Sequence, residues 1–147
     1  MKIKVIIDTN VAVSGLLWKG APNDILRLAR EGEIELCCTS FMIDELQKVL
    51  YYERLQERMK AIGVTQEELI DYYQDIVTAY DENSCVDIIK ADDTDNKFIA
   101  AALDSGAYII VSGDRHLLDL KEHRKVQILT PVEFLYFYQE LKAKGGM

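Results

Sequence analysis

Acidic side chains follow several short apolar segments of this sequence of 147 residues. The acids in question are Asp8, Glu45, Asp92, Asp95 and Asp114. Carboxylate oxygens are hard ligands, and no cysteine, HxxxH or HxH spacing accompanies them, so the set suits Mg²⁺ or Mn²⁺ better than Zn²⁺. A divalent-cation site of this kind requires a fold that brings these acids together.

The first apolar segment, residues 2–9, has the composition of a strand in a parallel sheet. Its run from Val5 to Ile7 is β-branched and unbroken, which is typical of a strand buried on both faces. Asp8 then stands at the carboxyl end of that strand, the edge of an open α/β sheet at which ligands bind. Asp is also a favoured N-cap, so a purely structural role at the start of the next helix stays open.

Apolar periodicity predicts that strands and helices alternate along the whole chain. Strands are expected at residues 2–9, 34–39, 85–89, 108–112 and 126–129, and helices at 10–17, 21–30, 40–50, 53–62, 65–80, 95–104, 115–118 and beyond 130. The helix at 65–80 has an apolar stripe that we expect to face the core, formed by Leu69, Tyr73, Ile76 and Tyr80. Thr65 with Glu68, and Thr130 with Glu133, have capping-box spacing. The alternation predicts one domain over residues 1–147, a three-layer α/β/α sandwich whose central parallel sheet has about five strands.

This arrangement predicts that the acids meet at one edge of the sheet. Glu45 lies about one turn into the helix after the second strand, Asp95 begins the helix after the third, and Asp114 follows the fourth by two residues. Like charges gathered in one cleft repel, so such a cluster needs a cation or raised pKa values. Each acid also has a structural explanation: Glu45 complements a helix dipole, Asp95 caps a helix, Asp92 solvates a loop, and Asp114 belongs to a turn.

The net charge of −8 opposes nonspecific binding of polyanions, since affinity for phosphate backbones comes largely from clustered Lys and Arg. The sequence has no apolar run near the roughly 18 residues of a membrane span and no signal-peptide core, so we expect a cytoplasmic protein. Cys37, Cys38 and Cys85 lie in apolar segments without CxxC spacing. We expect buried free thiols there, with metal binding or redox chemistry as the alternatives.

An ordered set of motifs resembles the PIN-domain ribonucleases, in particular the branch assigned as toxins of toxin–antitoxin pairs. The set comprises Val5-Ile-Ile-Asp-Thr-Asn-Val, Ser14, Ser40 with Glu45, then Asp92, Asp95, Asn96 and Lys97, and finally Val111-Ser-Gly-Asp. The resemblance runs from about Val5 to Val132. It implies a PIN-like fold and a metal-dependent endoribonuclease that cleaves phosphodiester bonds of single-stranded RNA.

The resemblance also implies roles for individual residues. The principal acids, which would be catalytic and would bind Mg²⁺ or Mn²⁺, are Asp8, Glu45, Asp95 and Asp114, and Asp92 falls on a fifth acidic position. Asn10 and Ser112 fall on polar positions beside the site, where the hydroxyl often belongs to Thr instead. Either Glu45 or Asp95 could orient the attacking water, and the sequence leaves that choice open.

Substrate contacts must come from local bases because the chain is acidic overall. We expect Lys48 and Arg115 to be the substrate-binding bases nearest the cleft. The expected partners are RNA, a cognate antitoxin protein and further copies of the chain, as a dimer or higher homo-oligomer.

Two other classes of function remain open. An aspartyl-phosphate phosphatase or receiver-like domain would use Asp8 as a nucleophile, although the phosphatase pattern would want an acid at Asn10. A non-catalytic PIN-fold module would bind another protein and cut nothing. Divalent-dependent RNA cleavage separates both from the ribonuclease.

Overall fold

The computed structural model describes residues 2–81, 93–114, 117–118, 122–123 and 126–145, and for 93–96 and 122–123 it describes the backbone alone. Its strands are β1 (Ile3–Ile7), β2 (Ile34–Cys38), β3 (Val77–Ala79), β4 (Ile109–Val111), β5 (Glu122–His123) and β6 (Val126–Leu129). Its helices are α1 (Thr9–Leu17), α2 (Ala21–Arg30), α3 (Ser40–Leu50), α4 (Glu53–Ile62), α5 (Gln66–Ile76), α6 (Asp93–Ser105) and α8 (Pro131–Ala143). Within these ranges, no helix has the length and apolar character that spanning a membrane requires.

The strands form one sheet in the order β3-β2-β1-β4-β6-β5. Five of them are parallel, as predicted, and β5 adds an antiparallel edge by pairing with β6. β1 lies in the middle, where Val5 pairs with Leu36 of β2 on one side and with Ile109 of β4 on the other. The carboxyl end of β1 is therefore flanked by the carboxyl ends of β2 and β4.

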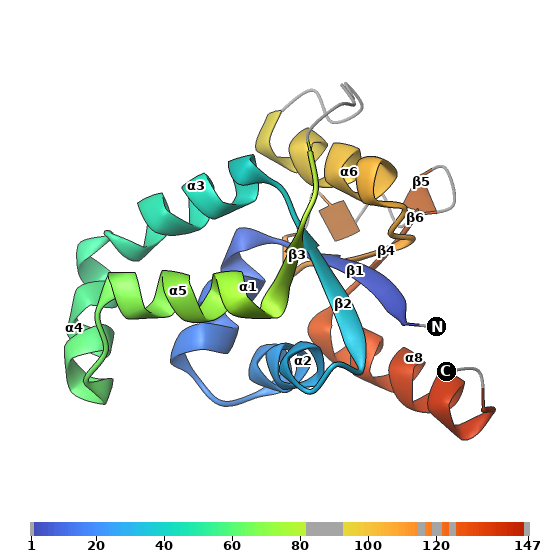
Figure 1. The fold of residues 1–147 in the computed structure, drawn as a ribbon, viewed down its shortest axis with the longest axis horizontal. Coiled ribbons are helices and arrows are strands. Elements are labelled where there is room, and N and C mark those ends of the chain that lie inside the picture. The colour runs from blue at the N-terminus through green and yellow to red at the C-terminus, as the bar shows by residue number, and fades with distance from the viewer. Residues whose placement is uncertain (1, 82–92, 115–116, 119–121, 124–125, 146–147) are drawn as a thin grey trace.

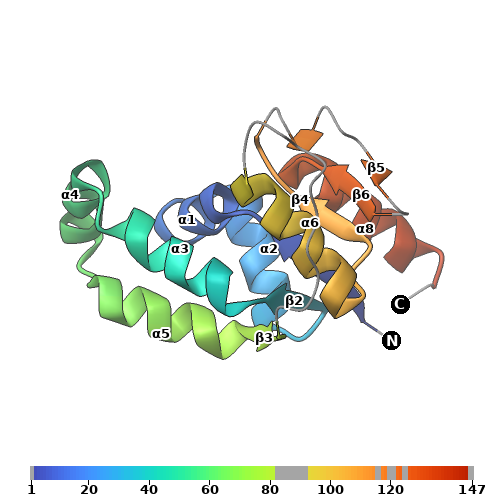
Figure 2. The same cartoon turned by 90° about the horizontal axis from the view of Figure 1, so that it is seen from above.

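Helices cover both faces of the sheet and extend beyond one edge. α6 lies over one face, and α2 and α8 lie over the other (Figure 1). α3 and α5 run together away from the sheet, and α4 forms the far end of the molecule (Figure 2). The predicted α/β/α sandwich with a parallel sheet of about five strands is confirmed.

The prediction that one helix continues from residue 65 to 80 is wrong. α5 ends at Ile76, and Val77–Ala79 pairs with β2 as the third strand in chain order. Val77 and Thr78 are β-branched, and the open edge of β2 offers them hydrogen-bond partners that a helix would not. Tyr80 then packs on the sheet instead of on a helix face: its hydroxyl donates to Glu35 Oε2 at 2.6 Å. The strand expected at 85–89 lies outside the described residues.

The capping boxes are present at both predicted helix starts. Cys37 and Cys38 are free and buried, as expected, whereas Cys85 lies outside the described residues. Burial raises the pKa of Cys37 to about 11 and that of Cys38 to about 12, so both stay protonated and unreactive at neutral pH.

A glycine allows α1 to lie directly against α2. A Cβ at Gly15 would be 2.8 Å from Leu26 Cδ1 and 2.9 Å from the carbonyl oxygen of Pro22. The Asn23 side chain donates to the Gly15 carbonyl at 2.8 Å and closes the same contact. α1 begins at the carboxyl end of β1, so this contact helps to fix the helix that starts at Asp8.

We predict that Gly15→Ala lowers the free energy of unfolding by about 1 kcal/mol. Overpacking costs about 1–3 kcal/mol, and the better helix propensity of Ala offsets about 1 kcal/mol of it. Urea denaturation measures the change, and Ser14→Ala, one position earlier on the same helix, should stay within about 0.5 kcal/mol of wild type. Unchanged or increased stability in Gly15→Ala would show that α2 moves away without penalty.

Candidate active site

Asp8 occupies the junction between β1 and α1. Its backbone N–H donates to Val111 O at 3.1 Å, which extends the β1–β4 pairing, and its extended backbone makes it the N-cap of α1. The side-chain Oδ1 accepts the N–H of Val11 at 2.8 Å. Only 5% of Asp8 is exposed. The capping role that the sequence left open is therefore real, and it uses one of the two carboxylate oxygens.

The other carboxylate oxygen joins Asp8 to the residues that follow β4. Ser112, which is completely buried, donates its hydroxyl hydrogen to Asp8 Oδ2. The same hydroxyl oxygen accepts the backbone N–H of Asp114 at 2.9 Å. Ser112 is itself fixed because its N–H donates to Leu129 O at 2.9 Å on β6. One serine thus holds the Asp8 carboxylate and the backbone of Asp114 in a fixed relation.

The electrostatics of Asp8 follow from this burial. Burial raises the pKa of the Asp8 carboxyl above its usual value, and the nearby charge of Asp114 raises it further. Hydrogen bonds from Ser112, Val11 and the backbone of Gly113 act in the opposite direction. A buried carboxylate beside a second acid is a natural place for a cation, because a cation removes both the desolvation penalty and the repulsion.

None of the described contacts joins Glu45, Asn10 or Lys48 to the Asp8 carboxylate. Glu45 is half-buried in the second turn of α3, and Asn10 is exposed in the first turn of α1. Lys48 is exposed in the last turn of α3. Asp95 lies in the first turn of α6, which starts two residues earlier than predicted, and its side chain is not described. Asp92 and Arg115 lie outside the described residues.

The part of the chain that the structure describes contains no cluster of three or more His, Cys, Asp or Glu side chains able to hold a metal ion. What it brings together is the pair Asp8 and Asp114, with Ser112 between them. The donor chemistry of this pair fits a hard divalent cation, since both side chains are carboxylates and the hydrogen bonds from Val11 and Ser112 occupy only part of the lone-pair positions of Asp8. α6 packs on β1, β2 and β4, and α1 packs on α3, so the helices that carry Asp95 and Glu45 neighbour the strand and helix that meet at Asp8.

The N-cap role that the sequence left open for Asp8 already implied a backbone donor from α1, but sequence reasoning missed the backbone donor after β4. The N–H groups of Val11 and Gly113 both favour the ionised form of Asp8. The sequence signal for the Val11 donor is an Asp between the end of a strand and the start of a helix. The signal for the Gly113 donor is the Ser-Gly-Asp turn after β4. A separate cavity of about 450 Å³ lies at the ends of β2 and β3, and none of the predicted site residues lines it.

We predict that replacing Asp8 by Asn changes stability in a pH-dependent way. Because the folded-state pKa of Asp8 is raised, the native protein binds a proton that the unfolded chain releases, and this contribution to stability is lost as pH rises through the folded-state pKa. In EDTA, Asp8→Asn should therefore become more stable relative to wild type as pH rises from about 4 to 7.5. Urea denaturation at each pH measures the difference, and a difference that is constant with pH would contradict the raised pKa.

The chain is similar to known proteins in sequence and in fold. At the level of sequence, the chain is 28% identical over 152 residues to Uncharacterized protein MJ1680 of Methanocaldococcus jannaschii, and the match covers 95% of this chain and 94% of that protein. The structure is similar to a chain in the crystal structure of VapBC2 from Rickettsia felis bound to a DNA fragment from their promoter. That match has a TM-score of 0.61 and 12% identity and covers 87% of this chain and 98% of the other, so it concerns the fold alone.

The family is identified by a sequence model. A model described as PIN domain matches residues 4–116, which include β1, the Asp8 junction, β4 and Asp114. PIN domains are generally nucleases, and such nucleases generally use divalent metal ions. Since the match extends over most of the sequence, the chain belongs to the PIN domain family.

Proposed function

We propose that this protein is a Mg²⁺- or Mn²⁺-dependent endoribonuclease that cleaves single-stranded RNA. The observation that carries the proposal is the buried Asp8 carboxylate, tied through Ser112 to Asp114, at the carboxyl edge of the central strand of a PIN-domain chain. A carboxylate that is fixed by several donors and still charge-coupled to a second acid is prepared for a cation. The fold of the chain supports the same assignment.

Asp8 and Asp114 would hold the ion, together with Glu45, Asp95 and Asp92. When bound, the ion supplies charge stabilisation at the phosphate and lowers the pKa of a coordinated water. The chain's own residues supply orientation: Ser112 fixes the direction of Asp8, and the N-cap bond from Val11 prevents its rotation. Asn10, exposed two residues after Asp8, would support the site, and Glu45 or Asp95 would orient the attacking water.

Phosphate affinity would come from Lys48 and Arg115, because the chain as a whole is acidic. Lys48 lies three residues after Glu45, on the same side of α3. A single-stranded RNA that passes Glu45 would therefore also pass Lys48. Arg115 follows Asp114 directly in the sequence.

We further propose that the enzyme is the toxin of a toxin–antitoxin pair, acting in the cytoplasm as one nuclease domain over residues 1–147. The motif resemblance to the toxin branch supports this role, and so does the likeness in fold to a chain of the VapBC2 structure. A cognate antitoxin would be its protein partner, and a homo-oligomer is the expected assembly. A small overlapping reading frame upstream of the gene would support the pairing, and an isolated gene would favour a stand-alone role in RNA processing.

We predict that Asp114→Asn and excess EDTA each reduce RNA cleavage at least about a hundredfold, because both remove charge stabilisation at the transferring phosphate. The assay uses 5′-labelled single-stranded RNA of random sequence and total cellular RNA, with Mn²⁺ or Mg²⁺. Asp24→Asn is the matched control, since Asp24 lies on α2 and pairs with Arg27.

Two outcomes would reject the assignment. Unchanged cleavage by Asp114→Asn would assign the activity to another site or to a contaminant. The absence of any product from both RNA pools with wild-type protein would favour a protein-binding module.

We also predict that Lys48→Ala weakens RNA binding and lowers the slope of log affinity against log salt by about 1, as expected for the loss of one phosphate contact. Fluorescence anisotropy in the Asp114→Asn background measures both quantities. Lys144→Ala, at the exposed end of α8, is the control. An unaltered slope would indicate that the RNA does not contact α3 at Lys48.

A further inference from the structure

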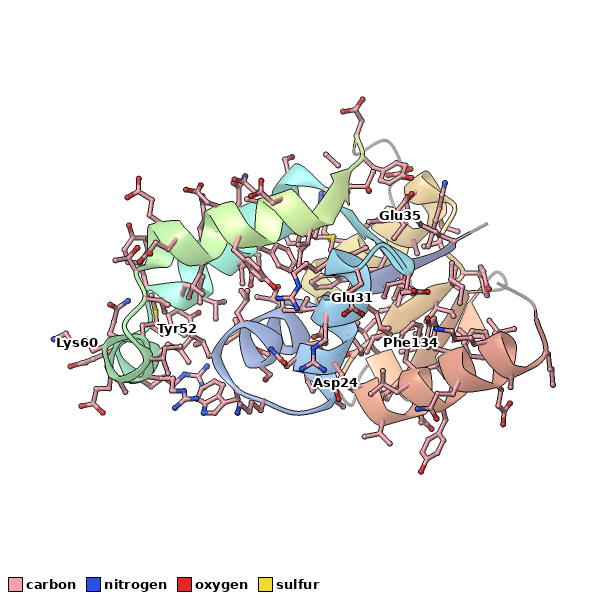
Figure 3. The ribbon with its side chains drawn as sticks, turned by 60° about the horizontal axis from the view of Figure 1, so that its bottom comes forward. Asp24, Glu31, Glu35, Tyr52, Lys60 and Phe134 are labelled. Atoms are coloured by element: carbon pink, nitrogen blue, oxygen red, sulfur yellow. The ribbon has the colours of Figure 1, made fainter. Side chains whose placement is uncertain are left out.

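Exposed aromatic side chains concentrate where α1 and α3 meet α4. Tyr51 and Tyr52 form the corner between α3 and α4, and Trp18 ends α1. Their exposed fractions are 70%, 43% and 43%, which is unusual for side chains that normally serve the core. Figure 3 shows Tyr52 and Lys60 at the end of the molecule that α4 forms, whereas Asp24 lies on α2.

Two of these rings are stacked with arginines of α4. The guanidinium of Arg54 lies 5.7 Å from the ring centre of Tyr52, and that of Arg58 lies 5.3 Å from the ring of Trp18. Arg54 and Arg58 are four residues apart and therefore share one face of α4. We call these four residues, Trp18, Tyr52, Arg54 and Arg58, the α4 platform.

Buried side chains and hydrogen bonds fix the position of the α4 platform. Leu55 and Met59 are buried and anchor α4 to the core. Arg58 Nε donates to the carbonyl oxygen of Leu17 at 2.8 Å, and Gln56 donates to that of Leu50 at 2.9 Å. The rings and guanidinium planes are thus presented in a fixed arrangement, which lowers the conformational entropy lost on binding.

The charge around the platform has the opposite sign to that of the whole protein. Segments 18–19 and 48–62 contain five bases and two acids, in a chain whose net charge is −8. The two acids, Glu53 and Glu57, are four residues apart, and Glu57 lies three residues after Arg54 on the same side of α4, so one acid lies beside the arginines. A basic surface with exposed rings has the composition of a single-stranded nucleic-acid site.

The platform and the carboxylate pair are connected by the same helices. Asp8 is the N-cap and Trp18 the C-cap of α1, whose nine residues span about 14 Å at 1.5 Å per residue. That length corresponds to about four nucleotides at a stacked spacing of about 3.4 Å. α3 also leads from the sheet to α4 (Figure 2), with Lys48 between Glu45 and Tyr52 in the sequence.

We propose that the α4 platform binds single-stranded RNA, with bases stacked on Trp18 and Tyr52 and phosphates bound by Arg54 and Arg58. The inference rests on the proposed ribonuclease function and extends it, since it places a second contact about four nucleotides from the cleaved bond. Stacking tolerates any base, because every base has a π-face. The platform would therefore favour longer substrates without selecting their sequence.

The test measures binding of labelled oligouridylate of 12 and of 3 nucleotides by fluorescence anisotropy, in the Asp114→Asn background. Trp18→Ala and Tyr52→Ala should each weaken binding of the 12-mer about tenfold, as expected for the loss of one base stack. The 3-mer is too short to reach from the Asp8 and Asp114 pair to the α4 platform, so its affinity should fall no more than about twofold in these variants. Trp18→Phe and Tyr52→Phe should retain most of the affinity, and Tyr136→Ala on α8, which removes a ring that is 66% exposed, should leave it unchanged.

The outcomes separate this inference from the proposed function. If wild type cleaves RNA but the alanine variants bind the 12-mer normally, the platform is not an RNA site and the nuclease assignment stands. If the alanine variants lose affinity for the 12-mer while wild type cuts no RNA, the platform stands and the nuclease assignment fails. If the alanine variants keep normal RNA affinity but change the sedimentation coefficient, the surface is a protein interface and the inference is overturned. A wild-type protein with no affinity for the 12-mer would also overturn it.

Discussion

The placement of one carboxylate in the middle of the sheet constrains everything around it. Asp8 is almost fully buried and lies at the end of β1, which has a parallel neighbour on both sides. Burial penalises its charge, so the fold surrounds it with donors from α1 and from the turn after β4. Those donors remove part of the penalty and leave the rest, and that remaining penalty is what favours a bound cation.

Much of the fold could be predicted because its signals are local. The apolar run of β1, the two capping boxes and the alternation of strand with helix each depend on a few neighbouring residues, and each is present in the structure. The position of Asp8 at a strand end was equally readable. Ser112 was identified only by its resemblance to a family motif, whereas its hydrogen bond to Asp8 depends on β1 and β4 being adjacent, which no local pattern records.

The errors have the same origin. Tyr80 continues the helical spacing of Leu69, Tyr73 and Ile76, but the open edge of β2 converts residues 77–79 into a strand. Tertiary pairing overrode a periodicity that was correct up to Ile76. In the site, sequence order predicted that several acids converge, and the described side chains establish this for Asp8 and Asp114 alone. Convergence of Glu45 and Asp95 depends on helix orientation, which spacing along the chain does not determine.

The described borders of the sheet have a consequence for behaviour in concentrated solution. β3 spans three residues and β5 spans two, so each border strand presents few backbone groups to a neighbouring molecule. Long flat borders recruit strands from other chains and seed aggregates, and short ones do not. The apolar interior strands β1, β2 and β4, which would be the most hazardous if exposed, are each enclosed between two partners. The strand order therefore limits edge-to-edge pairing by the described strands as well as fixing the position of Asp8.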